Sequence, residues 1–246
     1  MKKDSFPPVV AKSDPFFSVV AIAMIAALIL AFTTPSHAAE AGAGKRSRTK
    51  QRTGTYESSN GNSGTAESTT TRSKGELQRN GSWTNQDGQT GSRSLDRKWN
   101  KTTGTGTVSA STTGVNGKTE TREGTLTKNA DGSVASQGTI TGASGKVSTY
   151  AGTTVKTESG SSTTGTITGP GGKTATYDTE VSKVSPGEVS HSTTVTGPNG
   201  KTSEKVVDTK MNGDGTGTRT VEVTKPDGTT ETRTENFTVT VAGAAN

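Results

Sequence analysis

Glycine recurs in two regular series along most of this chain, and this spacing limits what the chain can fold into. The two series alternate at intervals of 12 to 16 residues, so that a unit of about 28 residues repeats from residues 58, 85, 114, 142, 169, 197 and 225. The first series is Gly61, Gly88, Gly117, Gly145, Gly172, Gly200 and Gly228, and the second is Gly75, Gly104, Gly132, Gly160, Gly187 and Gly215. A fixed period of this length is typical of repeat architectures.

Several of these glycines follow Asn or Asp, as in Asn116-Gly117 and Asp214-Gly215. Such pairs suit type I′ turns, in which both central residues have positive φ. Three of the turn glycines have a proline two residues earlier, which presets φ for entry into a turn; these are Pro170, Pro198 and Pro226. The two series therefore predict tight turns.

Between the turns lie segments of about ten residues that are rich in Thr, Ser and Val, such as residues 118–127 and 215–224. Thr and Val are stiff at χ1 and favour the pleated conformation. In residues 220–223 polar and apolar side chains alternate with a period of two, and no repeat shows a helical apolar stripe. The sequence predicts an all-β fold of up to thirteen strands.

Apolar side chains recur at fixed positions of the unit. One column contains Ile140, Ile167, Val195 and Val223, with Trp83 at the same position. A second, mixed column contains Tyr150, Tyr177, Arg122 and Lys205, and this mixture favours a solvent-exposed face. Aligned copies would form side-chain ladders.

About one residue in five after Ala38 is apolar, well below the usual share in globular chains. Because so little burial offsets the entropy of ordering the chain, a thick core is not expected. Three architectures remain: an elongated antiparallel meander, a solenoid with two strands in each rung, or a chain that orders only on assembly.

Residues 1–38 have the features of a bacterial signal peptide. A basic leader with Lys2 and Lys3 precedes the apolar run 16–32, and Ser36-His37-Ala38 offers small residues for cleavage before Ala39. The alternative is an uncleaved transmembrane anchor, since the run is just long enough to span a membrane. We expect signal peptidase and the export machinery as partners, no stable membrane span after cleavage, and a periplasmic, surface or secreted location.

Residues 39–57 are predicted to form a disordered basic linker before the repeat region 58–246. Five basic residues cluster there, namely Lys45, Arg46, Arg48, Lys50 and Arg52. Without them and the leader, the basic and acidic residues are equal in number. The cluster could bind a polyanion through counterion release, or it could be a solvated leader.

The composition excludes most catalytic and metal sites. With no cysteine, the chain lacks disulfides, thiolate metal sites and a lipid anchor on cysteine, and His191 is the only histidine after residue 38. The recurring Gly-x-x-Gly-Lys-Thr lacks the earlier glycine of a phosphate-binding loop. We expect no cofactor and no enzymatic activity. Trp83 and Trp99, near Arg93 and Arg97, could stack on a glycan or cover the sheet.

Two functions follow from these features. The first is an exported structural β-repeat protein of surface fibres or a biofilm matrix, which self-associates through exposed sheet edges. In period and composition the chain is similar to bacterial extracellular β-repeat proteins, including matrix subunits and fibrous adhesins. The second is a cell-surface module that binds an anionic polysaccharide or another polyanion through the basic residues 45–52.

Overall fold

The computed structural model describes residues 47–242, and this part of the chain contains fifteen strands and no helix. The predicted signal peptide 1–38 lies outside the described residues. No helix within residues 47–242 is long and apolar enough to cross a membrane. In chain order the strands are β1 (Arg48–Ser58), β2 (Ser63–Ser73), β3 (Glu76–Asn85), β4 (Thr90–Asn100), β5 (Thr105–Thr113), β6 (Thr119–Lys128), β7 (Val134–Thr141), β8 (Val147–Lys156), β9 (Gly160–Thr168), β10 (Thr174–Ser185), β11 (Glu188–Thr196), β12 (Thr202–Met211), β13 (Thr216–Thr224), β14 (Thr230–Thr238) and β15 (Thr240–Ala242).

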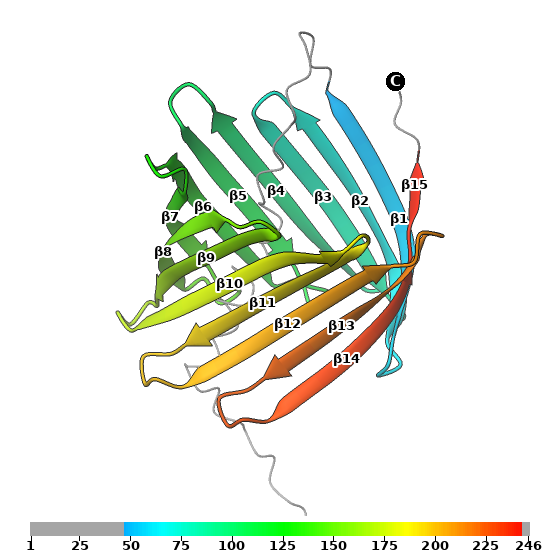
Figure 1. Cartoon of the computed structure of the whole chain (residues 1–246). Coiled ribbons are helices and arrows are strands. Elements are labelled where there is room, and N and C mark those ends of the chain that lie inside the picture. Colours follow the sequence, from blue (N-terminus) through cyan, green and yellow to red (C-terminus); the bar gives the residue numbers. More distant parts are fainter. Residues whose placement is uncertain (1–46, 243–246) are drawn as a thin grey trace, which may run out of the picture.

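Each strand from β2 to β13 pairs with its two neighbours in the chain, and β1 also pairs with β14 and β15. All pairings are antiparallel, so the sheet is a meander that closes into a barrel (Figure 1). The prediction of an all-β meander is confirmed, but the elongated form and the solenoid are wrong. Strand twist accumulates along a meander, and closure pairs the two strands that would otherwise be edges.

Each repeat supplies one turn, one strand, a second turn and a second strand. Two strands more than expected are present because β1 lies within the predicted linker and β15 follows β14 after Val239. The prediction of a disordered linker is therefore wrong for residues 48–57. Pairing with β2 on one side and with β14 and β15 on the other orders this basic segment.

The turns of the first glycine series differ from the expected type. In the β5–β6 turn, the Gly117 amide donates to the Gly114 carbonyl oxygen at 2.9 Å, and the Gly114 amide donates to the Lys118 carbonyl oxygen at 2.9 Å. Only glycines have positive φ within residues 47–242, so the type I′ prediction is wrong. The arrangement is a type I turn followed by a left-handed glycine. The Asn116 side chain accepts a bond from the Lys118 amide at 3.1 Å, and this local bond explains why Asn precedes the glycine.

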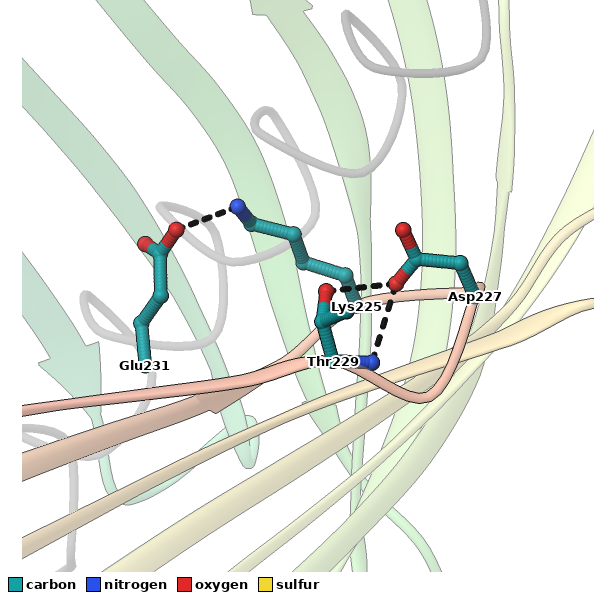
Figure 2. A network of polar contacts seen from close by, with 4 residues as sticks. All are labelled: Lys225, Asp227, Thr229 and Glu231. Atoms are coloured by element: carbon teal, nitrogen blue, oxygen red, sulfur yellow. Dashed lines mark hydrogen bonds and ion pairs between the residues drawn. The ribbon is translucent and has the colours of Figure 1, made fainter.

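The β13–β14 turn shows the same chemistry with aspartate (Figure 2). The Thr229 amide and hydroxyl donate to one carboxylate oxygen of Asp227 at 2.9 and 2.6 Å, respectively. The hydroxyl bond first, and then the amide bond, lower the pKa of Asp227. Beside them, Lys225 forms an ion pair with Glu231.

The glycines of the second series also have positive φ, with one exception: Gly160 begins β9 and does not have positive φ.

Buried side chains lie on one face of the sheet. Arg93 on β4 and Arg219 on β13 line one cavity, although β3, β2, β1 and β14 separate their strands in the ring. Such a cavity lies inside the barrel, so the face that carries these arginines is called the inner face. On β6 this face carries the buried Arg122 and Leu126, while the intervening Thr and Glu side chains face outward.

The two repeat columns lie side by side on this inner face. Tyr150 pairs with Ile167 and Tyr177 pairs with Val195 across neighbouring strands. The side chain of Val195 is fully buried, and Tyr177 is only 4% exposed. The expectation of a solvent face for the second column is therefore wrong, because antiparallel register brings both columns to the same side.

Aromatic side chains on the inner face lie over glycines of neighbouring strands. A Cβ atom at Gly91 would meet the Trp83 ring, and one at Gly152 would meet the Tyr177 hydroxyl. The remaining aromatic residues of the described part repeat the pattern: Tyr56 lies over Gly64, Trp99 over Gly106, Tyr150 over Gly124 and Phe237 over Gly217. The glycines inside the strands thus make room for flat rings, and the aromatic rings cover backbone that would otherwise be bare.

Candidate anion-binding site

A cavity of about 720 Å³ lies on the inner face where β1–β4 approach β13 and β14. Its size is within the range of small-molecule sites. Four arginines and three carboxylates line it, together with three aromatic rings: Arg52, Arg93, Arg219, Arg233, Glu67, Asp87, Glu235, Tyr56, Trp83 and Phe237. The cavity that these residues line is called the basic cavity.

Strand alternation brings these side chains together. Arg233 and Glu235 are two residues apart on β14 and share a face, and Glu235 lies directly opposite Arg219 on β13. From the other side of the ring, Arg93 lies on β4 and Arg52 on β1. The four arginines therefore come from four strands and meet only because the sheet is closed.

Glu235 is the carboxylate that the arginines of β13 and β14 share. An Arg233 guanidinium nitrogen lies 2.6 Å from one Glu235 oxygen, and an Arg219 nitrogen lies 3.7 Å from the other. Because this carboxylate forms ion pairs with both guanidinium groups, it occupies the position that an anionic group of a ligand would take. The four arginines that line the cavity outnumber its three carboxylates by one, so the cavity carries a small net positive charge.

Burial, and then neighbouring positive charge, lowers the pKa of arginines on this wall. Arg93 reaches solvent inside the barrel, yet partial burial and then the neighbouring Arg219 lower its pKa. Burial lowers the pKa of Arg79 as well, followed by repulsion from Arg93, Arg52 and Arg72. Arginines of β1, β2, β3, β4 and β13 thus lie near enough to one another for repulsion to add to the effect of burial.

Lys205 on β12 extends the positive charge beyond the cavity. Its pKa is lowered by burial, then by Arg219 and Arg233, and Glu235 partly opposes the shift. Next to it, His191 has a pKa lowered to about 4 by burial, with further repulsion from Lys205 and Arg219. At neutral pH His191 is therefore uncharged and adds nothing to the positive charge.

The structure divides the sequence-predicted basic residues. Lys45 and Arg46 lie outside the described residues. Arg48, Lys50 and Arg52 occupy alternate positions of β1 and so share its inner face, where Arg48 lies opposite Arg72 of β2. Of the three, only Arg52 lines the basic cavity.

The two tryptophans are also separated. Trp83 lines the basic cavity, whereas Trp99 lies away from it over Gly106, with the Arg97 guanidinium carbon 5.9 Å from its ring centroid. Both rings cover a strand glycine, since Trp83 lies over Gly91 in the same way. The glycan-stacking prediction stays a prediction.

Sequence reasoning missed Arg219, Arg233 and Glu235, and it gave Arg93 no role of its own. A signal existed for two of them, because Arg93 and Arg233 occupy the same repeat position as Arg122 and Lys205 in the mixed column. That column pairs with the apolar column, as Lys205 does with Val223. The shared repeat position indicates that Arg93 and Arg233 lie on the same face as Arg122 and Lys205, but closure of the sheet decides which face that is.

Residues 47–242 contain no group of three or more His, Asp or Glu side chains that could hold a metal ion. The prediction of self-association through exposed edges stays a prediction, although closure pairs six of the eleven residues of β1 and three of the nine residues of β14. No family model matches the chain, and neither a curated protein nor a solved structure is detectably similar to it.

Proposed function

We propose that this protein is an exported, non-enzymatic binding protein that holds an anionic glycan, or another polyanion, in its basic cavity. The observation that carries the proposal is the meeting of four guanidinium groups in one cavity of ligand size, where they outnumber the three lining carboxylates. Arginine is well suited to such a role, because its planar fork bonds carboxylate, sulfate and phosphate groups in a bidentate manner.

The aromatic wall narrows the ligand to one with flat, weakly polar faces. Tyr56 lies directly opposite Phe237 across the β1–β14 junction, and Trp83 lines the same cavity from β3. Rings of this kind stack on sugars, while guanidinium groups hold acidic substituents. An acidic oligosaccharide combines both features.

The test is binding of trigalacturonate to the full chain, measured by calorimetry at low and high salt. We expect affinity to fall as salt rises, since ligand anions release counterions from the arginines. The double variant Arg219→Gln/Arg233→Gln should lose at least about tenfold in affinity, because each bond to a charged partner contributes about 1.5–3 kcal/mol. The outward-facing pair Lys98→Gln/Lys210→Gln is the matched control and should bind normally.

Glu235→Gln should have the opposite effect on ligand affinity. Removing the carboxylate that Arg219 and Arg233 share frees both groups for the ligand, so binding should tighten by several-fold. Maltotriose, a neutral sugar of the same length, should bind weakly to every variant. Equal losses in the control pair, or binding that ignores salt, would contradict the proposal.

A structural role in surface fibres or a matrix is the second candidate. The observation that favours it is the short junction between the first and last strands, whose assembly chemistry is argued next.

A further inference from the structure

The junction that closes the barrel is much shorter than the others. β1 pairs with β2 over ten residues, from Arg48 to Glu57. On its other edge, β1 pairs with β14 over Tyr56–Ser58 and with β15 over 51–53, which is three residues in each case. Every other neighbouring pair in the ring has eight to ten paired residues. This junction is called the seam.

Side chains replace backbone pairing in the middle of the seam. Gly54 and Thr55 have no register partner in β14 or β15. Instead, the Thr55 amide donates to the Thr238 hydroxyl at 3.3 Å, and the two threonine hydroxyls lie 3.0 Å apart. A Cβ atom at Gly54 would overlap the Thr238 carbonyl oxygen, so the strands close only because residue 54 is glycine.

The seam is also staggered, and this leaves partly free edges. Within residues 47–242, the segment 48–50 of β1 and the segment 230–233 of β14 have a strand partner on one side only. Figure 1 shows β1 and β14 side by side, with β15 continuing along β1. Free strand edges of this kind are where a second chain can begin to pair.

We propose that the barrel opens along the seam and that β1 of one copy pairs with β14 and β15 of a second copy. The two edges are complementary by construction, because they already pair with each other in the closed monomer. The exchanged pairing can reuse the same register, including Tyr56 opposite Phe237 and Thr53 opposite Thr240. Monomer and assembly then contain the same bonds, so protein concentration decides between them.

The geometry of the exchange also sets the kind of assembly. Each copy offers one β1 edge and one β14–β15 edge, and the two differ. A contact between unlike edges leaves a free edge at either end, so copies add head to tail into chains or rings. This inference does not depend on a ligand in the basic cavity.

The test locks the seam with a disulfide. Because the chain has no cysteine, Thr55→Cys/Thr238→Cys introduces a single pair at positions whose hydroxyls are in contact. The matched control is Thr113→Cys/Thr119→Cys, whose hydroxyls lie 2.8 Å apart across the β5–β6 hairpin. Full-length proteins are compared by size exclusion with light scattering, from micromolar to millimolar concentration.

We expect the unmodified chain and the oxidised control to assemble as concentration rises, and the oxidised seam variant to stay monomeric until reductant is added. Gly54→Val, which obstructs closure, should assemble at a concentration at least tenfold lower than the unmodified chain. The proposal is overturned if the oxidised seam variant assembles like the control, if the unmodified chain is monomeric throughout, or if Gly54→Val stays monomeric with an intact β-sheet spectrum.

Discussion

Packing of an aromatic ring over a strand glycine makes a sharp prediction at Gly91. This residue is buried on β4, and the three atoms nearest to a Cβ added there all belong to the Trp83 ring, including the indole nitrogen at 2.8 Å. Gly91→Ala therefore cannot be accommodated without moving the ring. Trp83 lies directly opposite Gly91 in the pairing of β3 with β4, which places its ring over that glycine.

The expected cost follows from the size of this overlap. Overpacking by one methyl group typically costs about 1–3 kcal/mol. Loss of glycine's freedom in the unfolded chain returns about 0.4–1 kcal/mol. With the midpoints of these ranges, about 2 and about 0.7 kcal/mol, we expect Gly91→Ala to lower the free energy of unfolding by about 1.3 kcal/mol.

A double-mutant cycle isolates the contact. In the Trp83→Ala background the methyl group meets no ring, so Gly91→Ala should be neutral or slightly stabilising. The coupling energy between the two substitutions should lie within the range of roughly 0.5–3 kcal/mol that is usual for residues in contact. The control is Gly171→Ala, since a Cβ there meets nothing within 4 Å and residue 171 does not have positive φ. Urea unfolding followed by circular dichroism measures all variants. Equal destabilisation in both backgrounds, or a loss no larger than that of Gly171→Ala, would refute the reasoning.

Two further predictions concern a histidine and a turn. Because the folded chain holds the pKa of His191 at about 4 while the unfolded chain binds that proton near pH 6.5, this contribution to stability is complete above pH 6.5 and is lost as pH falls towards 4. His191→Gln should therefore lose less unfolding free energy than the unmodified chain between pH 6.5 and 4, by roughly 1–2 kcal/mol after allowance for solvent around the partly exposed ring. Urea unfolding at several pH values measures this difference, and an unchanged pH profile would contradict the pKa. Gly172 has a φ of 75°, so Gly172→Ala should cost about 1–2 kcal/mol, whereas Gly171→Ala beside it should cost nothing; equal effects would contradict the turn geometry.

The repeat made much of the local structure predictable. Every glycine of the first series has positive φ, as turn positions require. Residues of the two columns also pair across neighbouring strands, since Ile140 lies opposite Arg122 and Val223 lies opposite Lys205. These features depend on neighbours in the chain, and a period of about 28 residues records such neighbours.

The face on which each column lies could not be predicted in the same way. Arg122 and Tyr150 occupy one repeat position, and both are buried, with the Arg122 guanidinium carbon 4.0 Å from the Tyr150 ring centroid. A mixed column of Arg, Lys and Tyr is typical of a solvent face in an open sheet. Inside a barrel the same residues stack on one another, so the interpretation depends on closure.

Closure itself depends on residues that do not repeat. Gly54 and Thr55 near the start meet Thr238 near the end, and no unit between them carries this contact. Whether a meander closes is set by the summed twist and stagger of its strands, which no single unit encodes. Four arginines of the basic cavity come together only because of that closure, so the candidate site and the seam share one physical origin. A chain opened at the seam would separate Arg52 and Arg93 from Arg219 and Arg233, and an assembled form should therefore bind anions in the cavity only where a second copy restores the ring.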